Sequence, residues 1–120
     1  MASILVVDDS TLTRSIVRLA LRAEGHTVTE ARDGIEGIRV AEQLHPDLVI
    51  AGLTLPALGG VEMLRDLRDA SADAPFVVLS EPVTQGTRDQ CTALGVVAML
   101  DRPVDGTMLR KTIGAALPQA

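Results

Sequence analysis

The sequence predicts an α/β fold in which five parallel strands form one sheet with helices on both faces, a doubly wound (βα)5 arrangement. Short apolar runs alternate with helical patterns five times along the 120 residues. The run Asp47–Ala51 is nearly all apolar and is soon followed by Gly and Pro, which is typical of a strand buried on both faces. The strand order 2-1-3-4-5 is taken from known folds of this class.

In the first half of the chain, Ser3–Val7 and Thr27–Ala31 are predicted strands, the second at a sheet edge because polar residues interrupt it. Ser10 or Thr11 can cap a helix that Gly25 ends. Its apolar repeat is assigned to Leu12, Ile16, Leu19, Ala20 and Ala23. Asp33-Gly34 opens a second helix, Ile35 to Leu44, which Pro46 ends and whose Ile38 and Ala41 face inward.

The second half repeats this alternation. A helix is predicted from about Gly60 to Ala70, with Val61, Leu64 and Leu67 on one side. Two further strands follow, each paired with a helix. These elements are Phe76–Leu79, the weaker helix Thr84–Leu94, Val96–Leu100, and the last helix Asp105–Leu117 with Leu109, Ile113 and Leu117 inward.

Composition narrows the class of protein. The chain has a net charge of -5, which argues against nucleic acid binding through its overall field. Cys91 is the only cysteine, so an internal disulfide is excluded and a reducing compartment is indicated. No apolar run approaches the ~20 residues that cross a bilayer. The start, Met1–Val7, lacks the pattern of a signal peptide. We expect a single soluble cytoplasmic domain over residues 1–120 with no membrane partner.

The candidate functional residues follow the predicted strands. Asp8 and Asp9 come after the first strand, Gly52 after the third, Ser80 after the fourth and Arg102-Pro103 after the fifth. The carboxyl ends of parallel strands meet at one edge of the sheet, where ligands bind in open α/β folds. We therefore expect these residues to border one site.

Taken together, the motifs resemble the receiver domain of bacterial two-component response regulators, a flavodoxin-like fold, over essentially the whole chain. The matching stretches are ILVVDDS at 4–10, EARDGIEGI at 30–38, PDLVI at 46–50, LP at 55–56, GG at 59–60, VVLS at 77–80 and RP at 102–103. Each stretch alone is weak, but their joint order and spacing are strong. The resemblance implies a phosphorelay signalling module that is not an enzyme.

The resemblance also implies roles for individual residues. In the family, an acid pair and a third aspartate bind Mg²⁺, and the third aspartate takes a phosphoryl group from a histidine kinase. The acid pair matches Asp8 and Asp9, with Asp9 the direct ligand, and the hydroxyl that senses phosphate matches Ser80. The phosphoacceptor falls on Gly52, the lysine on Arg102 and the switch aromatic on Met99, so three positions depart from the family pattern.

Gly52 is the decisive departure. It has no side chain to accept a phosphoryl group or to bind metal, and the pocket loses one carboxylate charge, so no cofactor is required and Mg²⁺ binds weakly at most. Arg102 keeps the positive charge in a planar fork that suits a carboxylate. We hypothesise that it pairs with Asp8, Asp9 or Glu81 and stands in for the metal. Glu81 would also narrow access and repel a phosphodonor.

Each of these residues has a plainer interpretation. Asp8 and Asp9 can serve as a helix cap and a partner for Arg102, and Ser80 can bond nearby backbone. Met99 and Cys91 are then core residues. His26 and His45 stand far apart in turns, which disfavours a metal site. Thr54, as a substitute nucleophile, lacks an adjacent base.

The leading hypothesis is a degenerate receiver that signals by protein–protein contact with a signalling partner or with components of a histidine kinase system. The family docks partners and forms homodimers through the face made by its fourth helix, fifth strand and fifth helix. Candidates on that face are Arg88, Asp101, Met108, Lys111 and Thr112. One alternative is a phosphorelay receiver phosphorylated at a non-standard residue. Another is a small-molecule or flavin-binding domain, which the absence of a Gly-rich phosphate loop disfavours.

Overall fold

A computed structural model describes residues 1–53, 60–71 and 73–117. Within these residues, five strands and five helices alternate. The elements are β1 (Ser3–Val7), α1 (Thr11–Arg22), β2 (Thr27–Ala31), α2 (Gly34–Leu44), β3 (Leu48–Leu53), α3 (Gly60–Ala70), β4 (Phe76–Ser80), α4 (Gln85–Ala93), β5 (Val96–Asp101) and α5 (Gly106–Ala116). All strand pairs are parallel and the sheet order is β2-β1-β3-β4-β5, which confirms the predicted fold class and order.

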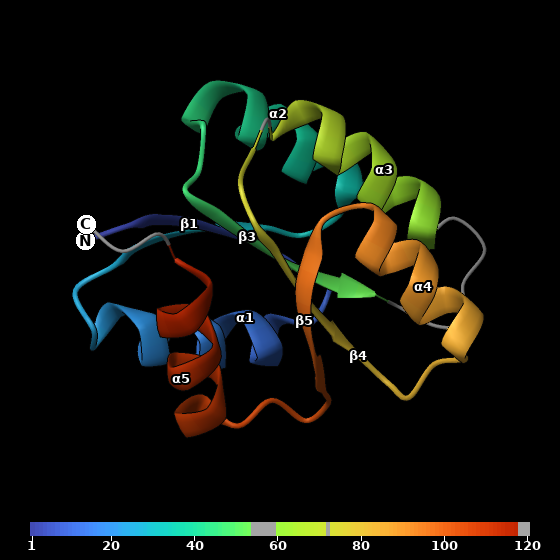
Figure 1. Ribbon diagram of the computed structural model, residues 1–120. Coiled ribbons are helices and arrows are strands. Elements are labelled where there is room, and N and C mark those ends of the chain that lie inside the picture. Colours follow the sequence, from blue (N-terminus) through green and yellow to red (C-terminus); the bar gives the residue numbers. More distant parts are fainter. Residues whose placement is uncertain (54–59, 72, 118–120) are drawn as a thin grey trace.

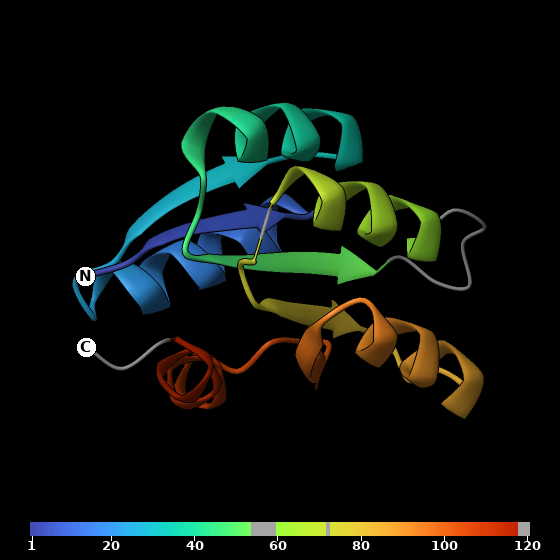
Figure 2. The same ribbon diagram turned by 45° about the horizontal axis from the view of Figure 1, so that its top comes forward.

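Helices cover both faces of the sheet, with α2, α3 and α4 on one face and α1 and α5 on the other (Figures 1 and 2). Side chains alternate between the faces along each strand. Leu5 and Val7 of β1 join the cluster under α2, α3 and α4, whereas Ile4 and Val6 join the cluster over α1 and α5. The central strands are therefore buried on both sides, as the apolar run in β3 predicted.

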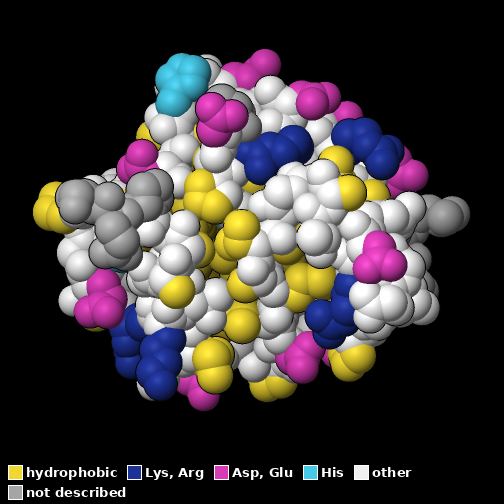
Figure 3. Space-filling view, viewed as in Figure 1, with side chains coloured by type: hydrophobic (Ala, Val, Ile, Leu, Met, Phe, Trp, Pro, Cys, Tyr) yellow, Lys and Arg dark blue, Asp and Glu magenta, His cyan; other side chains and the backbone are white. Residues whose placement is uncertain are grey.

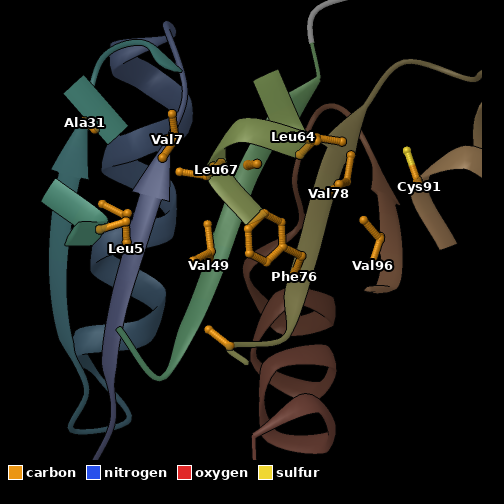
Figure 4. Packing of buried hydrophobic residues seen from close by; sticks show 13 residues of the cluster. Leu5, Val7, Ala31, Val49, Leu64, Leu67, Phe76, Val78, Cys91 and Val96 are labelled. Atoms are coloured by element: carbon orange, nitrogen blue, oxygen red, sulfur yellow. The ribbon is translucent and has the colours of Figure 1, made fainter. Parts of the chain in front are cut away.

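The core under α2, α3 and α4 is built around Phe76, the only aromatic residue of the chain. Figure 4 shows its ring on the sheet beside Val49, with Leu64 and Leu67 of α3 packed over this face. The guanidinium of Arg68 lies 4.4 Å from the ring centroid, and its Nη2 donates to the Ala74 carbonyl at 2.5 Å. Arg68 thus fastens the end of α3 to the start of β4.

Side-chain caps fix the helix starts. The hydroxyl of Ser10 accepts from the Thr13 N–H, the carboxylate of Asp33 from Glu36, and the carboxylate of Asp105 from Thr107. These residues satisfy amide groups that the first helical turn leaves without partners. The hydroxyl of Thr84 caps α4 in the same way. The predicted helix starts are confirmed to within a residue or two.

The apolar repeat assigned to α1 was wrong in part. Leu12 is 71% exposed and Leu19 is 67% exposed, whereas Val17 and Leu21 are fully buried. Ala20 belongs to the buried face as predicted, but so does Arg14. The helix carries apolar residues on two sides, and the side with Val17 and Leu21 packs on the sheet. Arg14 is tolerated on this side because polar partners satisfy its guanidinium.

Candidate functional site

The carboxyl edge of the sheet brings Asp8, Gly52 and Arg102 together. Asp8 follows β1, and its carboxylate is fully buried. Its Oδ1 accepts a hydrogen bond from the Ser10 N–H at 2.8 Å, while its Oδ2 accepts one from Arg102 Nη2 at 2.5 Å. Of the three carboxylates considered for Arg102, the structure therefore selects Asp8.

Arg102 connects three parts of the fold. It directly follows β5, and its backbone N–H donates to the Ser80 carbonyl at 3.1 Å. Its second guanidinium nitrogen, Nη1, donates to the hydroxyl of Thr13 in α1 at 3.1 Å. The side chain is 18% exposed, so the ion pair with Asp8 is shielded from most solvent. The planar fork thus holds β1, α1 and the end of β5 together.

The Asp8–Arg102 ion pair occupies the space next to Gly52. A Cβ built on Gly52 would clash with Asp8 Oδ2 and would lie 2.5 Å from Arg102 Nη2 and 2.7 Å from Asp8 Cγ. Real Cβ atoms do not approach heavy atoms this closely, so the carboxylate and guanidinium occupy the space that a side chain at position 52 would enter. The absence of a side chain at position 52 and the Asp8–Arg102 pair are two aspects of one arrangement.

The residues present do not fit a receiver-type Mg²⁺ site. Both oxygens of the Asp8 carboxylate already accept hydrogen bonds, Gly52 contributes no carboxylate, and Asp9 is exposed. Among the described residues, no group of three or more His, Cys, Asp or Glu side chains could hold a metal ion. Mg²⁺ prefers several anionic oxygen ligands. Here the guanidinium of Arg102, rather than a metal ion, supplies the positive charge next to Asp8.

A second charged network lies beside Asp8, and sequence reasoning missed it. The buried Arg14 donates from Nη1 to the Asp8 carbonyl at 2.7 Å and from Nε to Glu30 Oε1 at 3.1 Å. Arg18 donates to the other oxygen of Glu30 at 2.6 Å. The hydrogen bond from Arg18, followed by that from Arg14, lowers the pKa of Glu30, although burial opposes this. The available signal was a pair of arginines four residues apart, with an acid in the neighbouring strand.

The remaining predicted pocket residues lie where the strand pattern placed them. Ser80 is the last residue of β4 and is buried, and Glu81 directly after it is exposed. Met99 lies in β5 opposite Val78 and packs partly against the cluster under α2, α3 and α4. Their switch roles stay predictions, and Thr54 lies outside the described residues.

Cys91, His26 and His45 contribute to packing, hydrogen bonding or a helix end. Cys91 is a residue of α4 and is fully buried against the core, and burial raises the pKa of its thiol. Nδ1 of His26 accepts from the Ala2 N–H at 3.1 Å, and His45 ends α2 in a left-handed conformation with φ 51°.

The predicted partner face lies around β5, which is an edge strand. Asp101 and Met108 line a hollow of about 340 Å³, and Thr112 lines a neighbouring one of about 290 Å³ beside Val97. Arg88 in α4 and Lys111 in α5 are exposed on the flanking helices. Apolar side chains gather in the middle of this face, over β5 and between α4 and α5 (Figure 3).

Comparison with known proteins identifies the family. The model of the response regulator receiver domain matches residues 4–114. The chain belongs to this family. The receiver domain is the signalling module of two-component response regulators, and receiver domains interact with kinases and other signalling proteins. The recognition and the broad function predicted from sequence are therefore confirmed.

Relatives of this receiver domain occur both as short proteins and within longer ones. It is 34% identical to protein PilH of Pseudomonas aeruginosa over 98% of both chains. It is 30% identical to transcriptional regulatory protein GlrR of Escherichia coli over 119 residues, but it spans only 27% of that protein's length. Chemotaxis protein CheY4 of Vibrio cholerae superposes with a TM-score of 0.87 at 28% identity, covering 98% of this chain and 99% of CheY4.

Proposed function

We propose that this receiver domain signals by protein contact alone and takes no phosphoryl group at position 52. The observation that carries the proposal is the Asp8–Arg102 ion pair, which fills the space beside Gly52. Transfer to a receiver requires a carboxylate that forms an acyl phosphate and a divalent ion that neutralises the phosphoryl oxygens. Here the nucleophile is missing, and the carboxylate nearest the vacant position is bound to a guanidinium.

The hydrogen bonds of Arg102 to Asp8 and Thr13 favour a single conformational state of this receiver domain. In a phosphorylated receiver, pocket charges change when the phosphoryl group arrives. Here the positive charge is covalently part of the chain, and it is bonded to both Asp8 and Thr13. A ligand shifts an equilibrium only as far as it binds the two states differently, so a pocket without a phosphoryl site lacks that means of switching.

The proposal includes no obligatory cofactor and no enzymatic activity. Asp9 leaves one exposed carboxylate, which suffices only for weak Mg²⁺ association. Nucleic acid is not a proposed partner, since the net charge is -5. No helix among the described residues is long and apolar enough to cross a bilayer. A cytoplasmic location, where components of a histidine kinase system are accessible, belongs to the same proposal.

The surface proposed for contact is the α4–β5–α5 face, with a signalling protein or a second copy of the chain as the partner. Val97 and Met108 expose apolar area beside the edge strand, and Lys111, Arg88 and Asp101 add charges of both signs. Interfaces commonly combine an apolar centre with a polar rim, and this face has both.

The test is incubation of the wild-type protein with acetyl phosphate and Mg²⁺, followed by intact mass measurement. We expect no added phosphoryl mass. A phosphorylated wild type would overturn the proposal, and fragmentation would then locate the modified residue and favour the alternative of a non-standard acceptor. A colourless preparation without a nucleotide-dependent melting shift would dispose of the flavin-binding alternative.

A further inference from the structure

A groove between α2 and α3, on the side of the sheet away from α1 and α5, is not used by the function proposed above. The two helices lie side by side over the sheet (Figures 1 and 2). Gly34 allows their close approach, because a Cβ there would clash with Met63 Cγ and lie 3.4 Å from Met63 Sδ. The groove holds about 480 Å³, within the ~300–1,000 Å³ typical of ligand-binding clefts.

The groove combines apolar and acidic side chains. Ile35, Ile38 and Met63 form its apolar part, and Ile35 is 85% exposed. Isolated exposed apolar residues are common, but here the exposed Ile35 lies beside the half-buried Ile38 and Met63 in one depression. Asp33, Glu62 and Asp66 supply the charged groups.

All the charged side chains in the described lining of the groove are acidic, and the lining contains no Lys or Arg. Three basic residues are adjacent in sequence to the lining: Arg32 and Arg39 form ion pairs with Glu36 at 3.8 and 3.7 Å, and Arg65 precedes Asp66 without lining the groove. An apolar depression ringed by carboxylates complements a segment that presents an apolar side chain flanked by cationic ones.

We propose that the α2–α3 groove docks a basic segment of a partner protein, with an apolar side chain held against Ile35 and Met63 and with Lys or Arg residues facing Asp33, Glu62 and Asp66. A second copy of this chain is a poorer occupant. A twofold contact centred on the groove would bring two sets of these three carboxylates into one interface, and such juxtaposition of like charges is unfavourable. The proposal does not depend on whether position 52 is phosphorylated.

The test uses a synthetic helical peptide of Leu and Lys, with a Leu and Glu peptide of the same length as its control. Binding to the ¹⁵N-labelled chain is followed by chemical shifts. We expect saturable shifts at Ile35, Ile38 and Met63 with the cationic peptide only. Ile35→Ser and Asp66→Lys should each weaken binding about five- to tenfold, as expected when an anchor contact is removed.

Two matched variants separate the groove from general effects. Leu19→Ser removes an apolar side chain of similar exposure on α1, and Glu24→Lys changes the net charge as much as Asp66→Lys does. Both should change affinity less than about twofold, the scale of an exposed site outside the contact. Shifts on another face, equal weakening by Glu24→Lys, or concentration-dependent shifts at the groove without peptide would each overturn the proposal, the last in favour of self-association.

Discussion

At the scale of single residues, position 52 and the Asp8–Arg102 pair compete for one volume. The guanidinium and carboxylate can meet there because residue 52 has no Cβ. The reverse also holds, since Arg102 supplies positive charge to the buried Asp8, and no metal-binding cluster of acidic residues surrounds Asp8 in the part of the chain that the structure describes. Glycine at position 52 and arginine at position 102 are therefore coupled, and a change at either one affects the other.

Gly52→Ala should lower the free energy of unfolding by about 1–3 kcal/mol, because the added methyl forces the ion pair to move. Gly114→Ala is the matched control, since a Cβ at Gly114 in α5 meets nothing within 4 Å. A helical Gly→Ala change without strain should raise stability by about 0.5–1 kcal/mol. Urea unfolding measures both. Equal changes in the free energy of unfolding of the two variants would show that the ion pair moves aside for the methyl group without loss of stability.

Arg102→Met should destabilise the protein by about 3 kcal/mol, because it leaves the buried carboxylate of Asp8 without its cationic partner. Arg39→Met removes an exposed arginine whose ion pair with Glu36 spans 3.7 Å, and should cost less than about 0.5 kcal/mol. Chemical denaturation of the two variants at the same pH compares them. Similar losses would mean that the Asp8–Arg102 pair contributes no more than a surface pair.

At the scale of elements, α1 shows what a helical repeat cannot decide. Leu12 and Leu19 and, on the other side, Val17 and Leu21 both form helical stripes, and the sequence alone does not say which stripe faces the sheet. Arg14 lies on the buried stripe, where its guanidinium donates hydrogen bonds to the Asp8 carbonyl and to Glu30. Burying an arginine is strongly unfavourable unless it has such partners, and these partners come from other elements of the fold.

The contact between α1 and β2 should make stability depend on pH through Glu30. Its pKa is lowered in the folded protein from the ordinary 4.5, so its stabilising effect is present above that value and is lost as pH falls through the folded-state pKa. Glu30→Gln should cost about 0.5–1 kcal/mol at pH 7, allowing for solvent screening of a partly exposed group. The difference from wild type in urea unfolding should vanish well below pH 4.5. A constant difference across this window would assign the loss to packing.

Local opening of α4 should control the reactivity of Cys91, the one buried residue of that helix. Burial and the raised pKa both disfavour the thiolate that reacts with thiol reagents. Native protein should react at least ~100-fold more slowly than urea-unfolded protein. The control is Thr92→Cys in a Cys91→Ala background, which places the thiol at an exposed neighbouring position. Comparable native rates would indicate that α4 opens readily.

At the scale of the whole molecule, the fold could be predicted because each strand is a compact apolar run and each helix has a recognisable start. The meeting of Asp8, Gly52 and Arg102 followed from the same pattern, since parallel strands end at one edge. The choice of Asp8 over Asp9 or Glu81 could not be predicted, because it depends on where Thr13 and the backbone of Ser80 hold Arg102. The α2–α3 groove likewise depends on packing between two helices.

The whole-molecule prediction is that phosphoryl acceptance can be partly restored by Gly52→Asp together with Arg102→Lys. The pair returns the missing carboxylate, removes the fork that occupies its space, and keeps one positive charge for the phosphoryl oxygens. Intact mass after incubation with acetyl phosphate and Mg²⁺ should show partial modification of the double variant and none of Gly52→Asn with Arg102→Lys. Glu81→Ala added to the double variant should raise the modified fraction, because it removes a negative charge next to Ser80 at the pocket. If the Gly52→Asp, Arg102→Lys double variant and the triple variant with Glu81→Ala are both folded by circular dichroism and neither is modified, features other than positions 52, 81 and 102 prevent phosphoryl transfer.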